Sequence, residues 1–180
     1  MKRAIWALVF LFCAAVLSAS GQGNQDRRVN VAVKDVNPFL YSCLSYKGPI
    51  SDIPEVIGSL LETMQSQNII PMGPLVGIFY GDPATPKPES AEWEVGFPVI
   101  EQSLVQAPLM KKSWIFKTVA WAIHIGPYEE TPKTIDQILL WMEANGYKQN
   151  GPVLEQYAMD PETTDEGSLE TEIWIPCIQK

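Results

Sequence analysis

One glutamate in this sequence, Glu155, lies in the middle of a short run of strand-forming residues, Val153 to Tyr157. Side chains of a strand alternate between the two faces of a sheet, so Val153, Glu155 and Tyr157 should share one face. If that face is turned inward, Glu155 is a carboxylate among apolar and aromatic groups, and burial raises its pKa. Such a group is a candidate partner for a ligand cation. The other interpretation places Glu155 on the solvated face.

Tryptophans are the second candidate for a binding surface. Past residue 20 the chain contains Trp93, Trp114, Trp121, Trp141 and Trp174. Trp121 and Trp174 fall in predicted strands, where large aromatic rings can form a slot for a flat or cationic ligand. The alternative is that most of these tryptophans fill the hydrophobic core.

Metal and cofactor chemistry has little support in the sequence. His124 is the only histidine, and no cluster of Cys, His and Asp with metal-ligand spacing accompanies it. A lone histidine at the end of a predicted strand is more often a packed or surface residue. Motifs of nucleotide loops and of activated nucleophiles are also absent from the sequence. We therefore predict no metal site and no cofactor, and we interpret one acidic segment as solvated: Asp160, Glu162, Asp165 and Glu166.

An internal repeat organises the chain that must position these residues. A shift of 78 residues aligns 34–102 with 112–180 without a gap and gives 17 identities in 69 positions. Roughly 4 identities would arise by chance if about one position in sixteen matches. The identical pairs include Lys34/Lys112, Gly48/Gly126, Gly73/Gly151 and Glu94/Glu172. The two segments are therefore expected to share one local fold.

Each copy has the pattern of a βαββ unit. A segment rich in strand formers ends in a Gly-Pro turn, an amphipathic helix follows, and two further strands close the unit. The predicted strands are 39–46, 75–80 and 93–99 in the first copy and 116–125, 153–159 and 171–177 in the second. The helix positions predicted to face the core are Ile57, Leu60, Leu61 and Met64, and Ile135, Ile138, Leu139 and Met142.

Two such units predict an α+β fold of two tandem βαββ repeats related by a pseudo-two-fold axis. Each unit alone would expose one face of its sheet, and setting the two units together hides that face. We expect antiparallel sheets with a central cleft, because pockets favour seams where apolar surface from both halves converges.

The repeat allows each candidate residue to be compared with its twin. The twin of Glu155 is Gly77, which would leave room for a ligand opposite the carboxylate. Trp121 and Trp174 have the small twins Cys43 and Gly96, so an asymmetric aromatic slot would form. The predicted ligand-binding residues are Glu155, Tyr157, Trp121, Trp174, Gly77, Phe79 and Trp93.

The first 20 residues have the pattern of a secretory signal peptide. Lys2 and Arg3 precede the apolar run 4–17, and small residues follow that run. We expect cleavage near residue 20, a linker and strand start at 21–33, and one domain at 34–180. The product would be a periplasmic or secreted monomer without a stable membrane span. Loss of Lys2 and Arg3 takes the net charge from −8 to −10, which disfavours nucleic acid as a partner.

The cysteines leave alternatives open. Cys13 lies in the apolar run, where a lipoprotein anchor is the rival to a cleaved signal peptide. Cys43 and Cys177 remain after cleavage, in a compartment where disulfides can form. They are either bonded to each other or two buried free thiols, because two cysteines are too few for a disulfide scaffold.

Several runs of the second copy resemble one known family. They are Ala122 to Tyr128 (AIHIGPY), Leu140 to Tyr147 (LWMEANGY), Gly151 to Tyr157 (GPVLEQY), Asp160-Pro161, and Leu169 to Pro176 (LETEIWIP). With these motifs, residues 34 to 178 resemble the GyrI-like domain, the effector-binding part of AraC-type and multidrug-responsive MerR-type regulators. The resemblance implies a duplicated βαββ fold, similar also to that of SOUL-type haem-associated proteins. It also implies that Glu155 lies at the floor of a central pocket and pairs with cationic, aromatic ligands.

The resemblance also sets the candidate functions. No helix-turn-helix segment is found, so the regulatory role of relatives is not expected to transfer. The favoured function is an exported module that binds small, amphipathic, cationic or aromatic ligands in a pocket between the repeats. The first alternative is a hydrolase of strained or electrophilic molecules, as in cyclopropanoid-hydrolase-like relatives, with Glu155 as its catalytic residue. The second alternative is a haem-associated or structural interaction domain, for which His124 alone is weak support.

Overall fold

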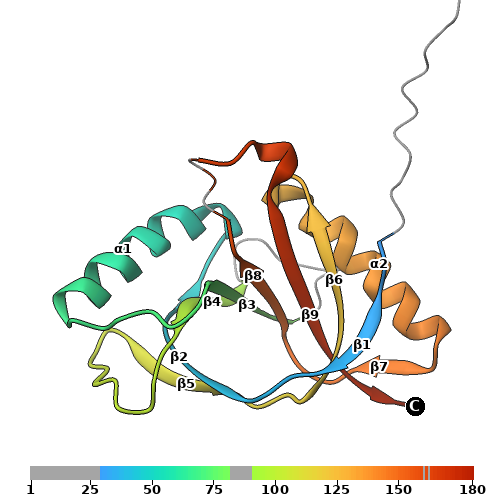
Figure 1. The fold of residues 1–180 in the computed structure, drawn as a ribbon, viewed down its shortest axis with the longest axis horizontal. Coiled ribbons are helices and arrows are strands. Elements are labelled where there is room, and N and C mark those ends of the chain that lie inside the picture. Colours follow the sequence, from blue (N-terminus) through green and yellow to red (C-terminus); the bar gives the residue numbers. More distant parts are fainter. Residues whose placement is uncertain (1–28, 82–90, 160, 162) are drawn as a thin grey trace, which may run out of the picture.

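Two helices flank a large antiparallel sheet in the computed structural model, which describes residues 29–81, 91–159, 161 and 163–180 (Figure 1). The strands are β1 (Ala32–Asp35), β2 (Phe39–Lys47), β3 (Leu75–Tyr80), β4 (Glu92–Pro98), β5 (Met110–Trp114), β6 (Thr118–Ile125), β7 (Tyr147–Gln149), β8 (Val153–Tyr157) and β9 (Glu170–Gln179). The helices are α1 (Ile53–Ser66) and α2 (Thr131–Ala144), each preceded by a short 3-10 turn. The α+β class predicted from the sequence is confirmed. The predicted signal peptide lies outside the described residues.

The order of the strands shows the duplication. Neighbouring strands follow the order β1-β6-β9-β8-β3-β4-β2-β5, and β7 pairs with β9 beside this path. The shift of 78 residues relates β2, β3 and β4 to β6, β8 and β9. Under this exchange the order reads the same from either end, so a pseudo-two-fold axis passes between β8 and β3. In Figure 1, α1 and α2 lie on opposite flanks of the molecule, with β8 and β9 between them.

The first strands of the two repeats are exchanged, a feature that the sequence pattern did not predict. The same shift relates β1 to β5, yet β1 pairs with β6 of the second repeat and β5 pairs with β2 of the first. Each repeat therefore supplies the edge strand of the other repeat's half. This exchange ties the halves together, because neither repeat completes its own part of the sheet.

The two helices bury one face each, although one predicted core position is wrong. Pro54 lies in the first turn of α1, where its missing N–H costs no hydrogen bond. Val56, Leu60 and Met64 of α1 are buried, whereas Leu61 is 47% exposed. The difference arises because the buried stripe of α1 includes Val56, which leaves Leu61 on the outer edge of the helix.

The sheet has a face covered by the helices and a face that carries no helix. Three clusters of buried residues form the core. One joins α2 to β6, β8 and β9, a second joins α1 to β4, and the third contains residues of strands such as Tyr41, Trp114 and Leu154. Strand alternation assigns the first two clusters to the helix-covered face and the third to the opposite face. The two faces therefore present different side chains.

The seam between the repeats is closed by strand pairing. Five residue pairs join β3 to β8, from Leu75↔Tyr157 to Phe79↔Val153, so the halves share one sheet. The antiparallel sheets expected for the two units are thus joined into one continuous sheet. Cys43 and Cys177 are both buried and free, which answers the question of a bond between them. In the described part of the chain, no helix is long and apolar enough to cross a membrane.

Candidate functional site

Glu155 lies on the helix-covered face, at the seam between the repeats. Glu155 is only 4% exposed, and its register partners are Gly77 in β3 and Ile173 in β9. The Tyr157 hydroxyl donates a hydrogen bond of 2.6 Å to Glu155 Oε2. Strand alternation left two interpretations open, and the structure has the inward one.

The surroundings of Glu155 raise the pKa of its carboxyl group. Burial raises the pKa of Glu155 to about 6, although hydrogen bonds from the hydroxyls of Tyr157 and Thr131 act in the opposite direction. Within the described part of the chain, no lysine forms an ion pair with this carboxylate. At pH 7 the group is thus mostly ionised, buried, and held only by neutral donors.

Aromatic side chains fill the space at Gly77, beside Glu155, that was expected to be open. The rings of Tyr128 and Tyr157 meet edge to face, with centroids 5.1 Å apart. A Cβ atom added at Gly77 would lie 2.9 Å from the Phe79 ring and 3.0 Å from the Tyr157 hydroxyl. Gly77 therefore makes room for the side chains of Phe79 and Tyr157, and a ligand would enter only if these rings move. This corrects the expectation that Gly77 leaves an empty space.

Trp93, also predicted to bind ligand, lies in the core beneath α1. It is among the largest fully buried side chains, and its ring packs against Tyr46 with centroids 4.9 Å apart. Its indole N–H donates to the carbonyl of Gly48 at 3.1 Å. All of its polar capacity is thus used inside the protein, and its role in this structure is packing.

Trp121 and Trp174 are on the opposite face from Glu155, which corrects the predicted slot. In the sheet, Trp174 is the partner of both Leu154 and Trp121, whereas Glu155 is the partner of Ile173. Neighbouring residues of a strand point to opposite faces, so Glu155 and Trp174 are separated by the thickness of the sheet. The two tryptophans and the glutamate cannot line a single pocket in this register.

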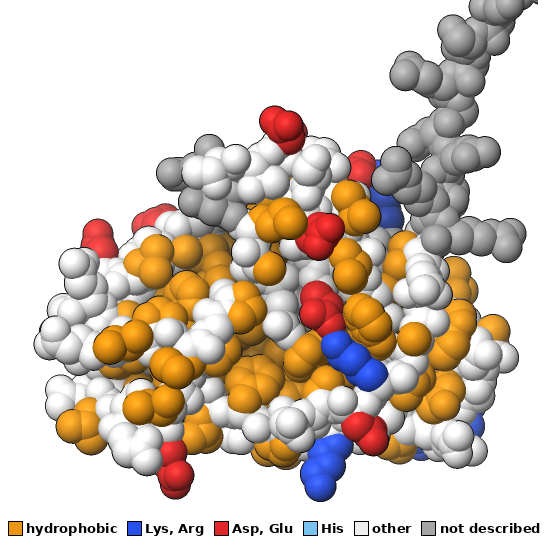
Figure 2. Space-filling view, viewed as in Figure 1, with side chains coloured by type: hydrophobic (Ala, Val, Ile, Leu, Met, Phe, Trp, Pro, Cys, Tyr) orange, Lys and Arg blue, Asp and Glu red, His pale blue; other side chains and the backbone are white. Residues whose placement is uncertain are grey.

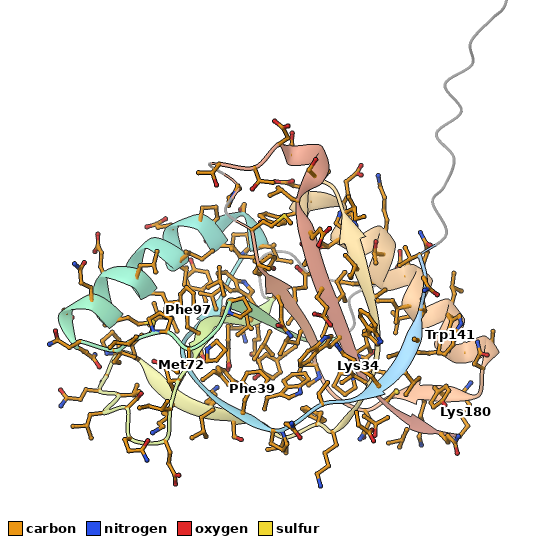
Figure 3. The ribbon with its side chains drawn as sticks, viewed as in Figure 1. Lys34, Phe39, Met72, Phe97, Trp141 and Lys180 are labelled. Carbon is orange, nitrogen blue, oxygen red and sulfur yellow. The ribbon has the colours of Figure 1, made fainter. Side chains whose placement is uncertain are left out.

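A lysine occupies the surface of these two tryptophans. Lys34 Nζ lies 4.3 Å from the centroid of the Trp121 ring and 4.7 Å from that of Trp174, and it forms an ion pair with Glu172. Figure 3 shows Lys34 and Phe39 on the visible side of the sheet. Phe39 meets Trp174 edge to face at 6.5 Å.

The twin of this ion pair forms a buried polar cluster that we did not predict as a site. Lys112 pairs with Glu94, and Glu94 also accepts hydrogen bonds from Tyr41 at 3.1 Å and Ser45 at 3.0 Å. Burial raises the pKa of Glu94, but these donors outweigh it and the net shift is downward. The signal was in the sequence, since Lys34/Lys112 and Glu94/Glu172 are identical pairs of the repeat.

An open hollow of about 470 Å³ adjoins this polar cluster. Its lining residues are Ser45, Tyr46, Lys47, Tyr80, Glu92, Trp93, Glu94 and Lys112. Two lysines and two glutamates balance in charge there. Burial is the main reason that the pKa of the neighbouring Cys43 is raised to about 12, so this thiol is protonated at neutral pH.

His124 is the remaining polar candidate whose contacts the structure describes. Both ring nitrogens of the buried His124 are engaged, Nδ1 with Thr134 at 2.9 Å and Nε2 with the Pro127 carbonyl at 3.0 Å. The residues that the structure describes contain no group of three or more potential metal ligands. Asp165 and Glu166 are exposed, whereas Asp160 and Glu162 lie outside the described residues.

The fold and site together define a duplicated α+β domain with one buried carboxylate at its pseudo-two-fold axis. The chain belongs to the family of the GyrI-like small molecule binding domain, whose family model matches residues 30–178. The family resemblance seen in the sequence is thus confirmed. The comparison with curated proteins found no match.

Solved structures share this fold at low sequence identity. The C-terminal domain of EcmrR is 17% identical, with a TM-score of 0.76 over 84% of this chain and 99% of that chain. In the EcmrR–DNA complex the match has the same TM-score and identity, 0.76 and 17%, and spans 85% of this chain and 59% of the longer EcmrR chain.

Two further structures share the fold. A hydrolase from Listeria innocua is 13% identical, with a TM-score of 0.63 over 83% of this chain and 92% of that chain. SAV2435 bound to tetraphenylphosphonium is 12% identical, with a TM-score of 0.52 over 83% of this chain and 94% of that chain. At these identities the likeness shows the fold alone.

Proposed function

We propose that this protein is an exported binding module for amphipathic organic cations with aromatic groups, and that Glu155 supplies the opposite charge. The observation that carries the proposal is an ionisable carboxylate that is 4% exposed, lies at the seam between the repeats, and has no cation beside it among the described residues. A buried charge without a partner is costly, and a bound cation would offset that cost.

The groups around Glu155 suit such a ligand. Tyr128, Tyr157 and Phe79 offer aromatic surface, which attracts a cation over the ring face. Binding requires that the hydroxyl of Tyr157 leave the carboxylate and that the Phe79 ring turn away from Gly77. The pocket between the repeats therefore opens as the ligand enters, with side-chain rotation as the main change.

Tetraphenylphosphonium is the probe of choice, because a protein of similar fold is known in complex with it. We expect its binding to quench tryptophan fluorescence and to weaken tenfold or more in Glu155→Gln, since tenfold corresponds to about 1.4 kcal/mol. Glu166→Gln, which removes an exposed carboxylate, is the matched control and should bind like the parent. The affinity for triphenylphosphine oxide, a neutral probe, should fall less on Glu155→Gln than the affinity for the cation. Equal affinity of parent and Glu155→Gln for the cation would rule out this role of Glu155.

A hydrolase is the second candidate, and one observation favours it. A carboxyl group with a pKa of about 6 is suited to general acid–base work near neutral pH. In that case Glu155 would be the catalytic residue, and a cyclopropane-bearing or other electrophilic substrate would disappear in the presence of the parent and not of Glu155→Gln. Such turnover would exclude a role in binding alone.

Export is a separate part of the proposal and rests on residues 1–20. Its test is the N-terminal sequence of the protein isolated from its native host. A mature N-terminus near residue 21 is expected, and an intact Met1 would contradict export through signal-peptide cleavage.

A further inference from the structure

We infer that a second site, specific for small organic ammonium ions, lies on the sheet face opposite Glu155. Trp121, Trp174 and Glu172 form this site, which we call the indole cage, and Lys34 of the same chain occupies it. The inference is independent of the proposed role of Glu155, because the two sites lie on opposite faces of the sheet.

The geometry of the indole cage is that of an ammonium receptor. The Lys34 ammonium lies over two indole rings, 4.3 Å from the centroid of Trp121 and 4.7 Å from that of Trp174. The Glu172 carboxylate forms an ion pair with the same ammonium. Trp174 Nε1 donates to Glu172 Oε1 at 2.9 Å, which fixes the carboxylate beside the rings. Aromatic cages of this kind recognise quaternary ammonium groups.

The other repeat shows that the indoles are not needed to hold such an ion pair. Lys112 and Glu94 are the twins of Lys34 and Glu172, and they form the same ion pair. Around that pair the positions of Trp121 and Trp174 are taken by Cys43 and Gly96, and hydroxyl groups bind the carboxylate instead. Only the second repeat therefore has indole rings at these two positions. The group that the rings contact is the Lys34 ammonium.

The indole cage is open to solvent and extends into a wider aromatic surface. Side chains of Lys34 and Glu172 are 30% and 32% exposed, so a ligand can reach them without opening the core. The partly buried Phe39 continues the wall, with its ring centroid 6.5 Å from that of Trp174. The buried Trp114, at 6.3 Å from Trp174, supports these rings from the core. Figure 2 shows hydrophobic side chains gathered over the middle of this face, and Figure 3 shows Lys34 and Phe39 there.

Lys34 is a displaceable occupant. It lies in β1, a four-residue strand at one edge of the sheet. A tethered group competes like a free ligand at roughly millimolar concentration. A primary ammonium is strongly hydrated, so it binds aromatic faces less well than a quaternary ammonium of the same charge. The ligand class that fits is therefore a small quaternary ammonium ion, which would replace Lys34 on the two indoles.

The test uses tetramethylammonium chloride as the probe, with sodium chloride at the same ionic strength as the reference. Binding is followed by tryptophan fluorescence and by titration calorimetry. We expect Lys34→Ala to bind tetramethylammonium at least tenfold more tightly than the parent. Adding Trp174→Leu or Glu172→Gln to Lys34→Ala should abolish the gain. Lys112→Ala is the matched control, since it frees the twin carboxylate where no indoles stand, and it should show no gain.

Circular dichroism and a melting curve establish that each variant is folded, and Lys34→Gln replaces Lys34→Ala if the alanine variant is not. The inference is overturned if removing the Lys34 charge gives no gain, or if the gain survives Trp174→Leu. It is also overturned if Glu155→Gln removes the gain in the Lys34→Ala protein, because that result assigns the binding to the seam. If the protein fails to bind tetraphenylphosphonium but the Lys34→Ala variant binds tetramethylammonium as expected, that result contradicts only the proposed function.

Discussion

Glu155 and Gly77 are the same position of the two repeats, and they are also register partners across the β3–β8 seam. The shift of 78 residues exchanges the two pairs on either side, Val76↔Gln156 and Ile78↔Leu154, so the pseudo-two-fold axis passes between Glu155 and Gly77. Only one side chain fits there, because a Cβ on Gly77 would meet the Phe79 ring and the Tyr157 hydroxyl. Two carboxylates on the axis would also repel each other. The asymmetry of the repeats thus follows from the crowding at the axis.

The stability of the unliganded protein should depend on pH through Glu155. Its pKa rises from 4.5 to about 6 on folding, so the carboxyl favours the folded state below pH 4.5 and loses that contribution as the pH rises through 6. The loss amounts to about 2 kcal/mol at 1.36 kcal/mol per pKa unit. Glu155→Gln should therefore be more stable than the parent at pH 7.5 by up to about 2 kcal/mol. Urea unfolding at pH 7.5 and pH 4 measures this, and an equal difference at both values would contradict it.

Cation binding should show the opposite preference for pH. Only the ionised carboxylate attracts a cation, so the affinity of the parent for tetraphenylphosphonium should fall as the pH drops below about 6. Fluorescence titrations between pH 5 and 8 would show the dependence. In Glu155→Gln the affinity should be flat over this range, and a parallel fall in the variant would assign the effect to another group.

Gly77→Ala should destabilise the protein by about 1–3 kcal/mol, because the added methyl group displaces the Phe79 ring and the Tyr157 hydroxyl from a packed position. Gly58→Ala is the matched control on the exposed side of α1, where nothing lies within 4 Å of the new methyl group. That control should stabilise the protein by about 0.5–1 kcal/mol, as alanine does in helices. Thermal melts of the two variants provide the comparison, and similar melting temperatures would argue against crowding at the axis.

The twin ion pairs should differ in their contribution to stability. The Glu94 side chain is 4% exposed, so Lys112→Ala leaves a buried charge unpaired and should cost about 2–3 kcal/mol at pH 7. The Glu172 side chain is 32% exposed, so Lys34→Ala should cost less than about 1 kcal/mol. The cost of Lys112→Ala should shrink in acid, where Glu94 becomes protonated. Equal costs for the two variants in urea unfolding would contradict the difference in burial.

Much of the fold could be predicted from local sequence patterns. Such patterns depend only on neighbouring residues, as in the Gly-Pro turns, the apolar stripes of α1 and α2 and the runs of strand-forming residues. Because the chain is duplicated, each pattern occurs twice and could be checked against its counterpart. Alternation within β8 placed Val153, Glu155 and Tyr157 on one face, and the family resemblance implied that Glu155 points inward. Leu61 was misplaced because the width of a helical stripe allows more than one choice of edge, and only packing against β4 selects it.

The register and the pairing of the strands could not be predicted from local patterns. Whether Trp174 shares a face with Glu155 depends on the register of β9 against β8, and a slip of one residue would reverse the answer. The exchange of β1 and β5 depends on pairings between residues about 80 to 90 positions apart for β1 with β6 and about 70 for β5 with β2, for which local pattern has no signal.

By itself the sequence determined the duplication, which follows from the shift of 78 residues. It also determined the element types and the shared face of Val153, Glu155 and Tyr157, because these follow from residue type and from spacing over a few positions. Packing decided that this face is buried. Tertiary structure alone decided that Trp121 and Trp174 lie across the sheet from Glu155, and that Lys34 rests on their rings. It also decided that Gly77 accommodates the rings of its own protein. These outcomes depend on long-range register and packing, where one residue of slip changes every neighbour.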